Sequence, residues 1–302
     1  MPSKQTKVSP VSKLRSILSG RRAVAAPGVY NPAVALLAED AGFECLHLSG
    51  AAFANSLGLA DAGVTTLTEV ADMARRISTA VPSLPLIVDV DTGFGEAVNV
   101  ARTVREMEKA GAAAIHIEDQ VSPKRCGHLD GKEVVEPKAM AEKVIAAKSA
   151  ATNLVLIART DARENEGLEG AIKRANLYKK AGAEVIFPEA LRSREEFAEF
   201  GRRVRGPLLA NMTEFGKTPY IPLPEFSKLG AYRLVIFPVT TFRVAMKAAE
   251  KALAELSRSG SQKAILDQLM TRDAFNRLVG YPTLLSADKR TSRRASRLLD
   301  NS

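Results

Sequence analysis

A reactive cysteine is indicated by one short segment of the chain. In residues 123–128, Cys126 follows a lysine and an arginine and precedes a glycine and His128. Nearby cations stabilise the thiolate, so they lower the pKa of a cysteine and make it a usable acid or base. An apolar run, residues 114–117, precedes this segment and ends in carboxylates, as a buried strand at an active site would. A surface basic loop with an incidental cysteine is the alternative.

A pair of carboxylates suggests a metal site. Asp89 and Asp91 stand two residues apart at the end of an apolar run, and Glu118 ends the next such run. Alternate residues of a strand point to the same face, so both aspartates can reach one ion. Hard oxygen ligands without a cluster of cysteines and histidines favour Mg²⁺ or Mn²⁺ over zinc. One aspartate capping a helix while the other forms a salt bridge is the alternative.

A guanidinium group lies at the end of another apolar run. Arg159 would be a costly buried charge without an anion, and its fork of donors suits a substrate carboxylate. A structural ion pair with Asp161 or Glu189 is the alternative interpretation.

The elements that would position these residues alternate regularly between strand and helix. Apolar runs bounded by Gly and Pro predict strands at 23–26, 45–48, 86–90, 114–117, 154–158, 185–187, 208–210 and 234–237. Helical patterns fill the intervals, at 33–41, 67–80, 97–110, 137–149, 167–181, 194–204 and 223–229, and one more follows at 241–256. Eight such units, without the G-x-G-x-x-G signature of dinucleotide-binding sheets, predict a closed (β/α)8 barrel of the TIM type.

Polar residues follow nearly every predicted strand. The carboxyl ends of barrel strands carry the active site in enzymes of this architecture. Here they carry hydroxyl, carboxylate, amide, guanidinium and imidazole groups in seven of eight cases. This distribution favours an enzyme. We expect a basic tail at 1–10, the barrel at 11–256, a helical extension at 257–285 and a second basic tail at 286–302.

Composition and charge narrow the class of protein further. Two cysteines cannot form a disulfide framework, and Cys45, in an apolar run, is expected in the core, which suits a reducing cytoplasm. The formal charge of +9 comes from the ends: residues 1–22 carry +6 and residues 286–302 carry +3. Solvated tails, rather than nucleic-acid or membrane binding, are therefore expected. A contact with an anionic surface, or a transit peptide at the N-terminus, is less favoured, because residues 11–18 read as an amphipathic helix.

Together these segments resemble the isocitrate lyase and phosphoenolpyruvate mutase superfamily, and within it the lyases that cleave 2-methylisocitrate. The resemblance covers residues 12–282. The matching segments are 47–51 (HLSGA), 56–61 (SLGLAD), 88–95 (VDVDTGFG), 115–120 (IHIEDQ), 124–128 (KRCGH), 158–161 (ARTD), 187–190 (FPEA) and 211–216 (NMTEFG). The Lys-Arg-Cys-Gly-His segment distinguishes the lyases from the phosphonate mutases.

The resemblance implies a reaction and a set of site residues. It implies cleavage of 2-methylisocitrate to pyruvate and succinate in propionate catabolism (the methylcitrate cycle), without an organic cofactor. Metal ligation falls to Asp89 and Asp91, with Glu118 acting through water, and Cys126 is the acid/base. The other implied site residues are His47, Asp61 and His128 for catalysis, and Ser49, Gly50, Ala51, Gly127, Arg159, Glu189, Asn211, Met212, Thr213, Arg243 and Arg272 for substrate binding. A homotetramer whose final helices are exchanged between subunits is also implied.

Two positions depart from the pattern of the family. Ala51 replaces a glycine of some members, and His47 stands where relatives often carry a tyrosine that has been considered as the base. A histidine that titrates near neutrality could take that role, as could Asp61 through water. Phe187 and Ile236 are candidates to line a niche for the substrate methyl group, or else belong to the core.

Alternative activities remain within and outside the family. A related lyase or decarboxylase would act on isocitrate, dimethylmalate or oxaloacetate. A non-catalytic barrel would bind RNA or acidic lipid through its basic ends, and deleting those ends would then abolish its function.

Overall fold

The computed structural model describes residues 8–300 of the chain. The first seven residues of the predicted N-terminal tail, and the last two of the C-terminal tail, lie outside this range. The chain forms two compact units, the first ending at Val244 and the second beginning at Ala245.

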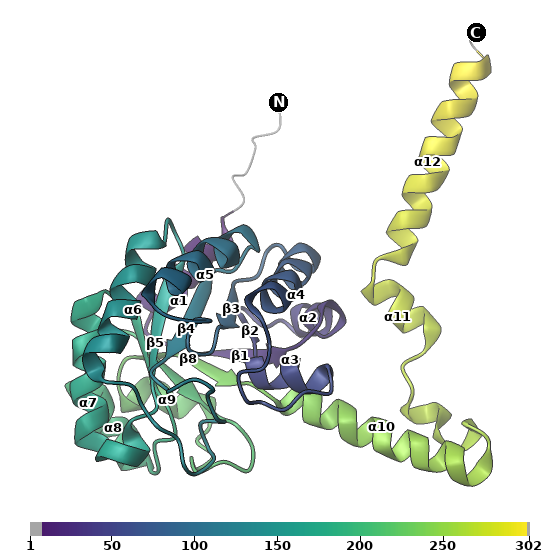
Figure 1. Cartoon of the computed structure of the whole chain (residues 1–302). Helices are drawn as coiled ribbons and strands as arrows, with labels where there is room; N and C mark the ends of the chain where they lie inside the picture. Colours follow the sequence, from purple (N-terminus) through teal and green to yellow (C-terminus); the bar gives the residue numbers. More distant parts are fainter. Residues whose placement is uncertain (1–7, 301–302) are drawn as a thin grey trace. The chain divides into compact units, whose positions relative to one another are not determined.

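The first unit is a closed barrel of eight parallel strands in sequence order, as predicted (Figure 1). The strands are β1 (Val24–Val29), β2 (Leu46–Leu48), β3 (Leu86–Asp89), β4 (Ala114–Glu118), β5 (Val155–Thr160), β6 (Val185–Pro188), β7 (Leu208–Asn211) and β8 (Tyr232–Phe237). Strand β1 pairs with β2 on one side and with β8 on the other, which closes the ring. Several strands run one or two residues beyond the predicted apolar runs. Arg159 is one such residue, and it is tolerated inside β5 because carboxylates surround it.

Helices of this unit precede the barrel or connect its strands. They are α1 (Pro10–Ser19), α2 (Pro32–Asp40), α3 (Gly50–Ser56), α4 (Leu67–Ala80), α5 (Ala97–Lys109), α6 (Pro137–Ala150), α7 (Arg163–Ala181), α8 (Arg194–Arg203) and α9 (Leu223–Leu229). Helix α10 (Thr240–Ser259) follows β8. Local signals explain their starts: Thr66 and Glu69 form a capping box before α4, for example. Helix α7 is interrupted at Gly167, where φ is 69°. The helix predicted from the sequence begins at this interruption, and the structure adds a short helical segment before it.

The short helix α3 was missed by the sequence analysis. Its seven residues are fewer than two helical turns and are too few to show a helical period. Its start is nevertheless encoded, because the Ser49 hydroxyl accepts a hydrogen bond from the N–H of Ala52.

Apolar side chains fill the inside of the barrel and the layer between strands and helices. One cluster joins inward-facing residues such as Ile87, Ile157 and Leu209 to Leu14 and Leu18 of α1. Helix α1 therefore packs against one end of the barrel, and fully burying a leucine contributes about 1.5–3 kcal/mol. Cys45 belongs to the same cluster and is completely buried, as expected.

The second unit holds most of α10, the 3-10 turn η1 (Lys263–Gln268), α11 (Arg272–Leu278) and α12 (Tyr281–Asp300). Large apolar side chains of these elements are exposed, among them Leu253, Phe275 and Leu284. Exchange of these helices between subunits stays a prediction. In the part of the chain that the structure describes, no helix is both long and apolar enough to cross a membrane.

Candidate active site

A cavity of about 280 Å³ opens at the carboxyl ends of the barrel strands. It gathers most of the residues singled out from the sequence, which come from segments far apart in the chain. Those that line it are His47, Ser49, Ala51, Asp61, Asp89, Cys126, Gly127, His128, Arg159, Glu189, Asn211, Thr213 and Arg243. Asn55, His116, Lys124 and Leu129 line it as well, although none of them was predicted as a site residue.

The start of α3 lies directly against Asp89. The backbone N–H of Gly50 donates to Asp89 Oδ2 at 3.2 Å. A Cβ at Gly50 would lie 2.9 Å from the same oxygen, so this close approach requires glycine. The hydroxyl of Ser49 is occupied in capping α3, which leaves backbone groups of this turn to face the cavity.

A cluster of carboxylates surrounds one ammonium group. Lys124 Nζ hydrogen-bonds Asp61 and lies 3.0 Å from Asp91 Oδ1. Burial alone would lower the pKa of Lys124, but Asp91, Glu118 and Asp61 raise it well above its ordinary value. Burial raises the pKa of Asp91 to about 6 against the opposing effect of Lys124. Asp61 and Asp91 thus offer two carboxylates to one ammonium, while burial raises the pKa of Glu118 well above its ordinary value.

The donor atoms of this cluster suit a divalent cation. Within residues 8–300, Asp91 Oδ1 and both oxygens of Glu118 are buried and accept no hydrogen bond, although ion pairs reach Asp91 and one Glu118 oxygen. Asp89 Oδ1 accepts the backbone N–H of Asp91 at 3.1 Å, which fixes the two aspartates relative to each other. Oxygen ligands short of hydrogen-bond donors are what Mg²⁺ or Mn²⁺ prefers. A second group, His47, Asp89 and His116, could also hold a metal ion.

Two histidines form a buried pair beside Asp89. His47 Nε2 lies 2.9 Å from His116 Nε2, and His116 Nδ1 is 3.6 Å from Asp89 Oδ1. Burial, with a smaller contribution from His116, lowers the pKa of His47 to about 3. The expectation that His47 titrates near neutrality was therefore wrong, because the enclosure of its ring could not be read from the sequence.

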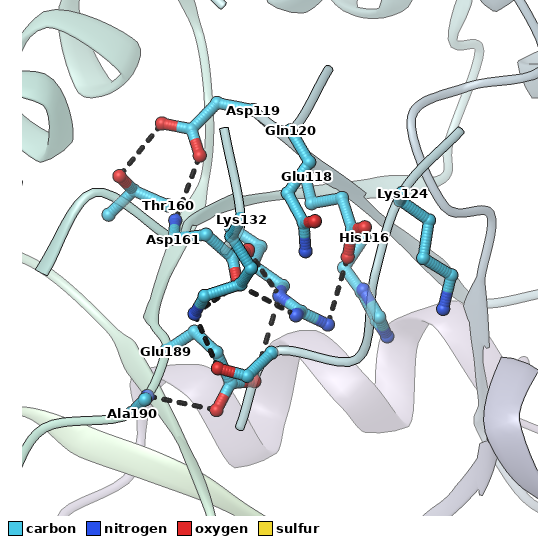
Figure 2. Close-up of polar contacts among 12 residues, drawn as sticks. His116, Glu118, Asp119, Gln120, Lys124, Lys132, Thr160, Asp161, Glu189 and Ala190 are labelled. Carbon is cyan, nitrogen blue, oxygen red and sulfur yellow. Dashed lines mark hydrogen bonds and ion pairs between the residues drawn. The ribbon is translucent and has the colours of Figure 1, made fainter. Parts of the chain in front are cut away.

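Arg159 is surrounded by carboxylates of its own chain. Its Nε and Nη2 lie 2.8 and 3.0 Å from the two oxygens of Asp161, and Nη1 lies 2.9 Å from Glu118 Oε2. Glu189 Oε2 is 3.6 Å away. Figure 2 shows these carboxylates converging on one point. The structural ion pair that the sequence left as an alternative is thus present, and Arg159 still lines the cavity.

The Cys126 thiol is half-buried, and its surroundings differ from the expectation. Burial, the largest influence, raises its pKa above the ordinary value of 9.0. The prediction that neighbouring cations lower this pKa was wrong, because the ammonium of Lys124 is engaged by Asp61 and Asp91. The cysteine is therefore protonated at neutral pH, the form that donates a proton.

The two residues that follow Cys126, Gly127 and His128, lie close to side chains of the barrel. A Cβ at Gly127 would lie 2.4 Å from Arg159 Nη2 and 2.6 Å from Glu189 Cγ, so glycine is required at this position. His128 Nε2 lies 2.8 Å from Glu189 Oε1.

The amide of Asn211 completes the polar wall. Its Nδ2 donates to the Glu189 carboxylate at 3.2 Å, while its buried Oδ1 has no hydrogen-bond partner among the described residues. Arg159 and His128 lower the pKa of Glu189, although burial alone would raise it. Glu189 is therefore ionised and joins the guanidinium, the imidazole and the amide in one network.

Four predicted site residues of this unit are not among those that line the cavity: Gly50, Asp91, Glu118 and Met212. Met212 presents its sulfur to the N–H of Ile221 at 3.5 Å. Arg243 is partly exposed and donates to the backbone oxygen of Glu214 at 2.7 Å. Arg272 begins α11 in the second unit, so its role stays a prediction.

Several buried polar residues of this region were not identified from the sequence. The side chain of Lys132 is fully buried and hydrogen-bonds the backbone oxygen of Gly127. Asp119 accepts the hydroxyl of Thr160 at 2.8 Å (Figure 2). It also accepts the hydroxyl of Tyr178 at 2.7 Å. Composition alone gives no sign that a particular lysine is buried. For Asp119, the available signal was its position directly after Glu118, the last residue of β4.

Comparisons with known proteins agree with this geometry. The family model described as phosphoenolpyruvate phosphomutase matches residues 14–257. A 2-methylisocitrate lyase of Aeropyrum pernix is 58% identical over 286 residues, covering 95% of this chain and 92% of that protein. The crystal structure of a 2,3-dimethylmalate lyase superposes with a TM-score of 0.88 at 37% identity, covering 94% of this chain and 96% of the other.

A phosphonopyruvate hydrolase, whose crystal structure is a complex with oxalate and Mg²⁺, has a TM-score of 0.85 at 30% identity. That alignment covers 93% of this chain and 99% of the hydrolase. The matched segments span the whole barrel and every strand end that lines the cavity. The chain therefore belongs to the phosphoenolpyruvate phosphomutase family, within the isocitrate lyase superfamily.

Proposed function

We propose that this protein is a carbon–carbon lyase that cleaves 2-methylisocitrate to pyruvate and succinate in propionate catabolism, as part of the methylcitrate cycle. The observation that carries the proposal is that a protonated Cys126 and the carboxylates of Asp61 and Asp89 line one cavity. Relatives named 2-methylisocitrate lyase that are 42–58% identical over most of the chain support it. The reaction is a retro-aldol (Claisen-type) scission.

Asp89 and Asp91 are the residues that would hold Mg²⁺ or Mn²⁺, with Glu118 acting through water. The divalent metal, when bound, supplies Lewis acidity toward the substrate hydroxyl and its neighbouring carboxylate. The two carboxylates offered to Lys124 support this assignment, as does the Mg²⁺ complex of the related hydrolase. No organic cofactor is proposed.

The residues of the chain itself bind and orient the substrate. Backbone N–H groups of residues 49–51 and the guanidinium of Arg159 would receive carboxylate oxygens. Because Arg159 already contacts Asp161 and Glu118, it holds those carboxylates as well as the substrate. Gly127, Glu189, Asn211, Met212, Thr213, Arg243 and Arg272 are proposed as the remaining substrate contacts.

Two groups are candidates to remove the hydroxyl proton. His47 is neutral and has a pKa lowered to about 3, so it accepts a proton poorly. Asp61 lines the same cavity and is held by Lys124. Asp61, acting through water, is proposed as the base because it lines the cavity, and His116 positions His47.

Cys126 is proposed as the proton donor that completes the reaction. After the carbon–carbon bond breaks, its electron pair remains on the succinate fragment, and the thiol proton moves to that carbon. Burial keeps the thiol protonated until it is needed. A positioned acid of this kind contributes about 10²–10⁴-fold to the rate. His128, held by Glu189, is proposed to fix the loop next to Cys126.

The methyl group of the substrate requires an apolar niche. Phe187 and Ile236 line the cavity and are 1% and 2% exposed, so they also belong to the barrel core. The Phe187 ring packs against Arg159, whose guanidinium carbon lies 5.2 Å from the ring centroid. Phe187 and Ile236 can therefore belong to the barrel core and still line a niche for the substrate methyl group.

Assembly and location are proposed with the activity. A cytoplasmic homotetramer with exchanged final helices would cover the apolar side chains that the second unit exposes. The partner would be a small tricarboxylate, with neither nucleic acid nor membrane.

The test is product identification with purified enzyme and Mg²⁺. Equal amounts of pyruvate and succinate from 2-methylisocitrate would support the proposal. The structural similarity to a 2,3-dimethylmalate lyase favours dimethylmalate as the second substrate to try. Cleavage of dimethylmalate alone would replace the proposed substrate and retain the reaction class.

A further inference from the structure

Lys217 lies in the segment after β7. Its backbone contacts the loop that carries Cys126. Its N–H donates to His128 Nδ1 at 3.0 Å. A ring nitrogen that accepts a hydrogen bond carries no proton, which leaves Nε2 as the ring nitrogen that can donate. That nitrogen lies 2.8 Å from Glu189 Oε1. The backbone of Lys217 thus selects the tautomer in which His128 donates to Glu189.

The side chain of Lys217 joins the same loop to a different part of the barrel. Its ammonium lies 2.5 Å from Asp130 Oδ1 and 3.1 Å from Glu164 Oε1. Asp130 belongs to the Cys126 loop, whereas Glu164 lies in the first turn of α7, which follows β5. The lysine side chain is 22% exposed and that of Glu164 is 18% exposed, so this bridge is partly shielded from water.

The loop is also held from its other end. The side chain of Lys132 is 0% exposed; its ammonium hydrogen-bonds the backbone oxygen of Gly127 and lies 3.2 Å from Asp161 Oδ1. The same ammonium lies 3.5 Å from Glu164 Oε2. Glu164 therefore receives both lysines, one from within the loop and one from the segment after β7.

The residue before Lys217 must be glycine for this contact to form. A Cβ at Gly216 would lie 2.6 Å from His128 Nδ1 and 2.9 Å from its Cγ. Even the smallest side chain would therefore push the imidazole away from its hydrogen bond with Lys217.

We propose that Gly216 and Lys217 form the surface on which the Cys126 loop is held closed, and that Lys217 is a positioning residue for the reaction. It acts through His128 and Asp130 and does not touch the substrate. The inference rests on the proposed role of the Cys126 loop in the lyase reaction. The closure itself, however, can be measured without turnover.

The test uses trypsin cleavage after Lys132, because this fully buried side chain reaches the protease only when the loop leaves the barrel. The change is Lys217→Gln, which removes the ammonium and keeps the backbone N–H. Lys228→Gln is the matched control, because Lys228 is an exposed lysine near the end of α9. Cleavage is quantified by mass spectrometry, and thermal denaturation verifies that each variant is folded.

Loss of the partly shielded ion pair with Glu164 and of the exposed one with Asp130 should make cleavage after Lys132 about twofold to thirtyfold faster in the Lys217→Gln protein. Added salt should speed this cleavage in the unmodified enzyme and in the control, but much less in Lys217→Gln. Gly216→Ala should also speed cleavage, while retaining the salt dependence because its charges are intact. In turnover, both changes should lower kcat more than they raise KM.

Equal cleavage rates for Lys217→Gln and the unmodified enzyme would overturn the proposal, and so would an unchanged salt dependence. Failure of the lyase function would appear differently. The unmodified enzyme would then not cleave 2-methylisocitrate, while the difference in trypsin cleavage between Lys217→Gln and Lys228→Gln would persist.

Discussion

Replacing Cys126 by serine should remove the proton donor while keeping the shape of the side chain. Burial raises the thiol pKa above 9.0 and so keeps it protonated, yet a thiol remains far more acidic than the serine hydroxyl. Positioned acid catalysis contributes about 10²–10⁴-fold, so kcat for pyruvate formation should fall by about that factor. KM should change little, because the hydroxyl occupies nearly the same space in the cavity wall.

The other cysteine provides the matched control. Cys45 is completely buried in the apolar cluster formed by inward-facing strand residues and α1, and it is not among the residues that line the cavity. Burial raises its pKa to about 12. Cys45→Ser buries a hydroxyl there and should lower the free energy of unfolding by about 1–3 kcal/mol, with kcat preserved in the folded enzyme. The assay is coupled reduction of pyruvate, with urea unfolding measured alongside.

The pH dependence provides a second check on the same group. The donor is active in its protonated form, so activity due to Cys126 persists below its raised pKa and is lost as pH rises through it. Because that pKa lies above 9.0, the alkaline limb of kcat assigned to this thiol should also lie above pH 9. A Cys126→Ser enzyme with near-normal kcat would refute the reasoning, since the proton would then come from another group.

Three further predictions follow from the site and the core. EDTA should abolish activity, and Mg²⁺ or Mn²⁺ should restore it. The Asp89→Ala and Asp91→Ala enzymes should neither regain activity nor bind Mn²⁺ in electron paramagnetic resonance titrations. Full turnover without metal would contradict this prediction. Gly127→Ala should lower kcat/KM by about 10²-fold, because its Cβ would displace the loop from Arg159; steady-state kinetics that match the unmodified enzyme would refute the close contact. Phe197→Ala should cost about 3–5 kcal/mol in urea unfolding, because this 1% exposed ring packs in the core; a cost below 1 kcal/mol would contradict that packing.

The barrel itself could be predicted from the sequence, because a parallel strand buried on both faces leaves a continuous apolar run. All eight runs became neighbouring strands, in chain order. What the sequence could not supply was the depth of each polar group below the surface. His47 was expected to titrate near neutrality, whereas burial lowers its pKa. The two cations before Cys126 suggested a lowered thiol pKa, whereas burial raises it.

Partners across the barrel were equally hidden from the sequence. Arg159 and Asp161 are two residues apart, so their pairing was foreseeable. Lys124 and Asp61, in contrast, lie far apart in the chain, and only the fold brings together the segments after β4 and β2 that carry them. Gly216 illustrates the same limit: its motif was visible, but its reason, the imidazole of His128 against its Cα, appears only in three dimensions.

The most direct test of the proposed activity is a comparison of 2-methylisocitrate with isocitrate as substrates of the same enzyme preparation. Pyruvate formation reports the first reaction and glyoxylate formation the second. One methyl group in an apolar niche is worth about 1–3 kcal/mol. The kcat/KM for 2-methylisocitrate should therefore exceed that for isocitrate by about tenfold to two-hundredfold. Equal or greater efficiency with isocitrate would contradict the proposed substrate and the methyl niche formed by Phe187 and Ile236.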